Sequence, residues 1–82
     1  MANYTLPNYT ETTDSSGATV LYTKTPLVIK SLAIHTQYED NNFVVSLNSL
    51  DYKPEVLGSW DDTYIYSTSF NTFEEAVDFI IN

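Results

Sequence analysis

Residues 63–81 read TYIYSTSFNTFEEAVDFII, and within this stretch the spacing of the apolar side chains changes from that of a strand to that of a helix. Between Thr63 and Phe70 every second position holds Tyr64, Tyr66, Thr68 and Phe70, which is the two-residue period of a strand with one covered face. After Thr72 the apolar residues recur every three or four positions, as in a helix packed along one side. The sequence therefore predicts a strand followed directly by a short C-terminal helix.

The start of this helix is marked by Thr72-Phe73-Glu74-Glu75, which fits a capping box. The Thr72 hydroxyl can accept a hydrogen bond from the backbone N–H of Glu75, while the Glu75 side chain reaches back to Thr72. The residues that form the apolar stripe are Phe73, Ala76, Val77 and Ile80, with Ile81 beside them. A helix of about two and a half turns is marginal alone, so we expect the stripe to pack on a sheet.

Further strands are predicted upstream of this stretch. Residues 18–23 are rich in β-favouring side chains. Residues 43–48 form the clearest strand, because every second side chain from Phe43 onward is apolar. The polar residues 39–42 before it suit a hairpin turn.

Residues 27–36 allow two interpretations. Their apolar side chains fall at helical spacing, and Thr25-Pro26 could begin a helix. Their high content of β-branched residues favours a strand instead. We interpret the segment as a strand with a bulge near Lys30 and Ser31, because its alternation slips phase there.

Together these elements predict an α+β fold, with an antiparallel sheet of about four strands and one C-terminal helix packed on one face. The 82 residues are expected to form a single small domain, residues 1–82. Residues 1–16 are rich in Asn, Thr, Ser and Tyr, and we expect them to form a loosely ordered N-terminal arm. Residues 50–62 contain Pro54 and Gly58 and should form a long connection across the sheet.

The composition favours a folded cytoplasmic protein. Hydrophobic residues make up 43% of the chain and aromatic residues 15%, which is too much for a disordered chain. Cysteine is absent, which excludes a disulfide framework, a thiol nucleophile and a thiolate metal site. No apolar run approaches the roughly 18 residues of a membrane helix, and residues 1–5 have no feature of a signal peptide. We therefore expect no membrane contact.

The charge is strongly one-sided. Eleven acidic residues face three lysines and no arginine, which gives a formal net charge of −8. Nucleic acids and anionic membranes are bound chiefly through Lys and Arg, so direct binding to either is not expected. A basic protein is the favoured partner.

No motif for catalysis, a cofactor or a metal stands out. His35 is the sole histidine, and no serine has the glycine context of a nucleophile elbow. The only glycines, Gly17 and Gly58, do not form a phosphate-binding loop. Asp61-Asp62 and Glu39-Asp40 could offer oxygen ligands to calcium or magnesium but lack the spacing of an EF-hand. We therefore predict a protein that is not an enzyme and has no cofactor or metal site.

Aromatic and acidic side chains remain as candidates for a binding surface. A domain of this size cannot bury all of its seven tyrosines, four phenylalanines and one tryptophan, although half or more could fill the core. On the helix, Glu74 and Asp78 are a like-charge pair four residues apart, and keeping such a pair hints at a basic partner. The residues that we predict to contact a partner are Trp60, Asp61, Asp62, Tyr64, Tyr66, Glu74, Glu75 and Asp78, with Tyr52 near them.

In size and charge, though in no particular motif, the chain is similar to the small acidic inhibitors that bacteriophages make against host nucleic-acid enzymes, including anti-CRISPR and anti-restriction proteins. This similarity implies a non-enzymatic inhibitor or regulator that blocks a basic nucleic-acid-binding surface on a partner protein. The alternative is a structural or assembly module that acts by self-association through its sheet edge or aromatic face, for example as a homodimer.

Overall fold

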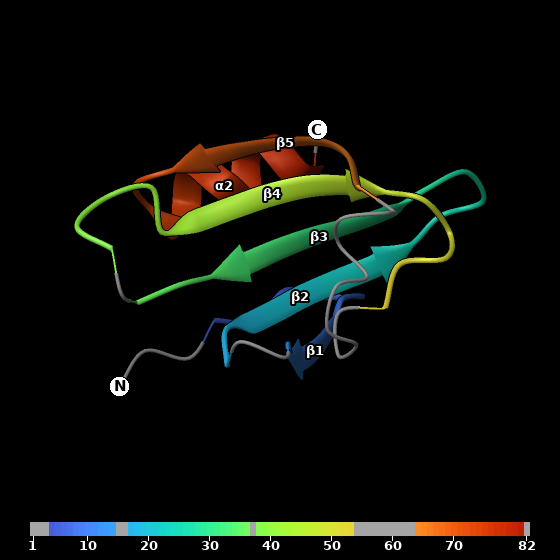
Figure 1. Cartoon of the computed structure of the whole chain (residues 1–82), viewed down its shortest axis with the longest axis horizontal. Coiled ribbons are helices and arrows are strands. Elements are labelled where there is room, and N and C mark those ends of the chain that lie inside the picture. Colours follow the sequence, from blue (N-terminus) through green and yellow to red (C-terminus); the bar gives the residue numbers. More distant parts are fainter. Residues whose placement is uncertain (1–3, 15–16, 37, 54–63, 82) are drawn as a thin grey trace.

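The computed structural model describes residues 4–14, 17–36, 38–53 and 64–81. They form an antiparallel sheet with one helix packed on it, so the expected α+β fold is confirmed, with five strands rather than about four (Figure 1). The sheet order follows the chain, β1-β2-β3-β4-β5, and each strand is antiparallel to the next. The elements are β1 (Thr10–Thr13), β2 (Thr19–Lys24), β3 (Ile29–Ile34), β4 (Phe43–Asn48), β5 (Tyr64–Phe70) and α2 (Phe73–Ile81).

The additional strand, β1, comes from the N-terminal part of the chain. Its sequence, TETT, has no apolar alternation, which is why the pattern of the sequence did not reveal it. The turn into β2 is held by Asp14, whose side chain accepts a hydrogen bond from the backbone N–H of Ala18 at 2.9 Å. Gly17 has a φ of 95° in this turn, a conformation that residues with a Cβ adopt only at a cost. The strand is therefore specified by its turn rather than by hydrophobic pattern.

Residues 27–36, whose sequence allowed two interpretations, contain a strand, β3, as interpreted. The prediction of a bulge near Lys30 and Ser31 is wrong. The pairing of β3 is continuous against both β2 and β4. The apparent slip in alternation arises because both faces of this central strand are covered. Ile29 and Ser31 are buried on one face, whereas Leu32 and Ile34 are buried on the other.

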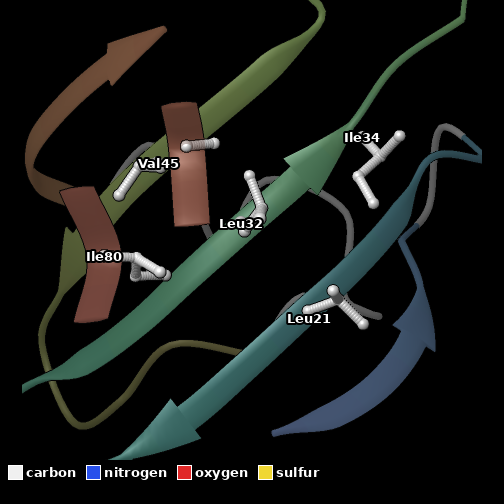
Figure 2. Packing of buried hydrophobic residues seen from close by; sticks show 6 residues of the cluster. Leu21, Leu32, Ile34, Val45 and Ile80 are labelled. Carbon is white, nitrogen blue, oxygen red and sulfur yellow. The ribbon is translucent and has the colours of Figure 1, made fainter. Parts of the chain in front are cut away.

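The main core lies between α2 and one face of the sheet. Leu21, Leu32 and Val45 point from neighbouring strands to the side on which Ile80 enters from the helix (Figure 2). The predicted apolar stripe of α2 is confirmed: Ala76 and Ile80 are buried, and Phe73 and Val77 pack against the same core. Tyr4, Leu6 and Tyr9 of the N-terminal segment also pack against it. Burial raises the pKa of the Tyr9 phenol above its ordinary value.

On the face of the sheet opposite to α2, buried side chains form hydrogen bonds between β3 and β4. Asn48 is 2% exposed, and its Nδ2 donates to the backbone oxygen of Ile29 at 3.2 Å and to Ser31 Oγ at 3.0 Å. Ser31 is itself buried. A buried polar group without a partner costs free energy, so this contact favours the observed register of β3 and β4 over shifted registers.

We expect Asn48→Ala to lower the free energy of unfolding by about 1–3 kcal/mol, because it leaves buried acceptors without their donor. Urea denaturation should show a lower midpoint with an unchanged slope. Ser69→Ala, at an exposed position of β5, should change the free energy of unfolding by less than about 0.5 kcal/mol. Equal effects of the two substitutions would contradict a structural role for Asn48.

Candidate partner-binding surface

The structure describes the positions of the predicted binding residues only in part. Trp60, Asp61 and Asp62 lie outside the described residues, and only the backbone of Tyr64 is described, in β5. Tyr52 is half-buried in the connection after β4. The four others are exposed and lie on two neighbouring elements: Tyr66 on β5, and Glu74, Glu75 and Asp78 on α2.

An open cavity of about 700 Å³ lies between α2 and the sheet. Its apolar part comes from β4, β5 and the helix, and Glu75 and Asp78 supply carboxylates from α2. Lys30 also lines it. We call this cavity the acidic groove, and its lining residues are Lys30, Val45, Leu47, Phe70, Glu75, Asp78, Phe79 and Ile80.

Aromatic rings form a continuous row beside the groove. The Phe79 ring lies 5.4 Å from that of Phe70 and is stacked with that of Tyr66 at 6.5 Å, measured between ring centroids. Phe79 is 44% exposed and Tyr66 48% exposed, so both rings offer contact area to a partner. Phe70 and Phe79 were not among the predicted site residues. Phe79 could have been found, because it is a large apolar residue outside the buried stripe of the helix.

A β-bulge shapes this part of β5. Tyr64 is opposite Asn48 and Tyr66 is opposite Leu47, so Ile65 is an extra residue in β5. Bulges of this kind change the direction of side chains and are frequent near functional sites. Here the bulge directly precedes Tyr66, and the exposed Ile65 adds apolar surface next to the aromatic row.

The helix that bears the carboxylates is fixed at both ends. The predicted capping interaction is present: the backbone N–H of Glu75 donates to Thr72 Oγ1 at 3.2 Å, and this hydroxyl donates to Glu75 Oε1 at 3.0 Å. At the other end α2 has no basic residue of its own in the last turn. Lys30 of β3 takes that place, donating from Nζ to the backbone oxygen of Ile80 at 3.3 Å. The position of Glu75 and Asp78 is therefore set by contacts at both helix ends.

A second acidic segment lies beside the start of α2. Glu39 and Asp40 are exposed in the β3–β4 connection. The next residue, Asn41, donates its backbone N–H to Asn71 Oδ1 at 2.8 Å, just before the helix begins. Figure 1 shows this connection and the start of α2 at the same end of the sheet. We call these carboxylates the acidic end, and they are Glu39, Asp40, Glu74, Glu75 and Asp78.

The acidic end contains five of the eight carboxylate side chains in the described part of the chain. The remaining three are Glu11, Asp14 and Asp51, which lie on other segments. Most of the described carboxylates are therefore carried by two segments, the β3–β4 connection and α2, which the hydrogen bond from Asn41 to Asn71 connects.

The residues considered for other chemistry are also described in part. His35 is half-buried and packs edge-on against Tyr38, with ring centroids 5.5 Å apart. Among the side chains that the structure describes, no three of His, Cys, Asp or Glu gather as they would around a metal ion. The helix of the described chain, α2, is too short to cross a membrane.

Comparison with known proteins found no match: no family model fits the chain, and neither a curated protein nor a solved structure is significantly similar to it.

We expect Thr72→Ala to lower the free energy of unfolding by about 1 kcal/mol, because it removes the acceptor for the Glu75 N–H. Thermal unfolding followed by circular dichroism would measure the loss. Thr36→Ala, at an exposed position outside the strands and the helix, serves as control and should leave the midpoint nearly unchanged. An unaffected Thr72→Ala variant would show that the cap does not hold the helix.

Proposed function

We propose that this chain is a non-enzymatic protein-binding module that docks its acidic end and acidic groove on a basic nucleic-acid-binding surface of a partner protein and so inhibits it. The observation that supports this most directly is the joining of carboxylates from two segments, through Asn41 and Asn71, next to a half-exposed aromatic row. A surface of this kind offers both charge and apolar contact area. Basic nucleic-acid-binding sites, which combine Lys and Arg with aromatic side chains, match both.

The number of charges limits how far the module can imitate DNA. A duplex carries one charge per about 1.7 Å, so one spanning the 30 Å length of this molecule would carry roughly eighteen. The acidic end provides five described carboxylates. Only a short strip of a nucleic-acid backbone can be imitated, and the aromatic row must therefore supply much of the affinity.

The contributions of charge attraction and of apolar contact to the binding affinity should differ in how they depend on salt concentration. Charge attraction between exposed groups weakens as ionic strength rises, because the Debye length falls to about 8 Å at physiological salt. Contacts made by Phe79 and Tyr66 depend on apolar burial and are little affected by salt. A partner held by both should lose part of its affinity with added salt and retain the remainder.

The experiment begins with a partner captured at moderate salt, whose dissociation constant is then measured between about 50 and 300 mM NaCl. We expect the triple variant Glu74→Gln, Glu75→Gln, Asp78→Asn to bind roughly tenfold more weakly at the lowest salt and with a flatter salt dependence. Duplex DNA should compete with the wild-type chain for the same partner.

A matched control neutralises carboxylates elsewhere, as in Glu11→Gln with Asp51→Asn, and should bind nearly as wild type does. Phe79→Ser should weaken binding equally at all salt concentrations, since it removes apolar contact area. Equal losses for the helix triple variant and its control, or a lack of competition by DNA, would contradict the proposed docking surface.

A further inference from the structure

The acidic groove carries opposite charges at its two ends. Two residues separate β5 from α2, and the helix runs back along the strand (Figure 1), so Glu75 in its first turn lies at the same end of the groove as Phe70. Lys30 lies at the other end, because its Nζ donates to the backbone oxygen of Ile80 in the last turn of α2. Apolar side chains from β4 and the helix line the stretch between them. A ligand that fills the groove therefore meets a carboxylate at one end and an ammonium at the other.

The register of the sheet gives the length of the groove. Phe70 is opposite Phe43 of β4, and Lys30 is opposite Leu47 of the same strand. The rows at Phe43 and Leu47 are four strand residues apart, which is roughly 13 Å at about 3.3 Å per residue. A ligand whose charged ends each lie about 3 Å from their partners therefore has roughly 7 Å between its own charges.

We propose that the acidic groove binds the C-terminal lysine of a polypeptide, with the ε-ammonium at Glu75 and the terminal carboxylate at Lys30. This inference rests on the proposed function in that the groove receives part of a partner protein, and it names the group received. The carboxylate carbon and Nζ of an extended lysine are roughly 7.5 Å apart, since six bonds of ordinary length join them. This length matches the space between the two charged ends.

Each charged end can form the contacts that a C-terminal lysine needs. An ammonium has three donors, and Lys30 uses one of them for Ile80. Glu75 Oε1 accepts from the Thr72 hydroxyl, and the carboxylate can accept further hydrogen bonds through its second oxygen. The aromatic ring of Phe70, at the same end as Glu75, also attracts an ammonium.

The middle of the groove suits the stem of a lysine side chain. Val45 and Leu47 from β4 and Phe79 from α2 give an apolar lining, against which the methylene groups can be buried while both charges stay at the ends. A ligand with positive charge alone would face the Lys30 ammonium, and one with negative charge alone would face the Glu75 carboxylate. The pattern therefore selects a ligand that carries both charges.

The charge at Lys30 favours a polypeptide end over the free amino acid. Free lysine has an α-ammonium beside its carboxylate, and this group would lie next to the Lys30 ammonium and be repelled by it. In a polypeptide the same nitrogen belongs to a peptide bond and is uncharged. Because the groove is open to solvent, the chain that precedes the C-terminal lysine can leave it.

The test is titration of the isotope-labelled whole chain with the peptide acetyl-Gly-Gly-Lys, followed by the NMR shifts of the backbone amides. We expect saturable shifts at the residues of α2 and β4 that line the groove. The same peptide with a C-terminal amide, and acetyl-Gly-Gly-Leu, should each bind roughly tenfold or more weakly, because each lacks one of the two charges. The compound 6-aminohexanoate, which has both charges at the same spacing, should compete with the peptide.

Variants at the two ends test which charge each end binds. Glu75→Gln removes the charge but keeps an oxygen for the Thr72 hydroxyl, and it should weaken binding of acetyl-Gly-Gly-Lys roughly tenfold. Lys30→Met should weaken it by a similar factor but leave the affinity for the amidated peptide unchanged, whereas Lys30→Arg should restore most of the binding. Glu74→Gln and Lys24→Met remove the same kinds of charge outside the groove lining, and these matched controls should bind as wild type does.

The outcomes separate this proposal from the proposed function. Absence of saturable shifts, equal affinity for the free and the amidated peptide, or equal effects of Glu75→Gln and Glu74→Gln would overturn the assignment of the groove. Binding of 6-aminohexanoate without binding of the peptide would also overturn it, because the groove would then take a small molecule. The titration contains no partner protein, so a negative result leaves the proposed function to its salt and DNA competition experiment. Conversely, a chain that binds the peptide but no basic partner in a salt-dependent way would contradict the proposed function and support the role of the groove.

Discussion

The packing of α2 on the sheet is the interaction on which the remaining structure depends. A helix of nine residues is not stable in water without tertiary contacts, and here Ala76 and Ile80 provide them by entering the core beside Leu32 and Val45. The same contact closes one face of the sheet and fixes the rotation of the helix about its axis. Once that rotation is set, the outward positions of the helix are determined, and acidic side chains occupy most of them.

Other parts of the chain cover α2 near its start but leave it open on the side toward β5. The centroid of the Tyr4 ring lies 4.8 Å from that of Phe73 and 5.6 Å from that of Phe43. The N-terminal segment therefore completes the core near the start of α2. Toward β5 the described residues leave the acidic groove open. The difference explains how a small domain can be well packed and still present large apolar side chains to solvent. It also explains why the aromatic row lies between the helix and the sheet edge.

Sequence reasoning found the elements whose residues repeat with a clear period. The cap at Thr72, the buried stripe of α2 and the strand beginning at Phe43 all follow from local chemistry, and the structure has each of them. Two features were missed for physical reasons: β1 has no apolar alternation, and the bulge at Ile65 depends on pairing with β4. The segment of β3 was recognised as a strand, but because both of its faces are covered it lacks a simple period, and a bulge was wrongly inferred within it. In the candidate site, Tyr66 and the acidic helix residues could be named from sequence, whereas their proximity to Phe70 and Phe79 required the sheet order.

The hydrogen bond from Asn41 to Asn71 connects two loops that are far apart in the sequence. It ties the carboxylates of the β3–β4 connection, Glu39 and Asp40, to the segment from which α2 begins. Charges held at constant spacing have little conformational freedom left to lose when a ligand arrives, and the electric potential that they produce is not averaged out by loop motion. A single amide contact at the periphery thereby limits how far the two acidic segments can move relative to each other.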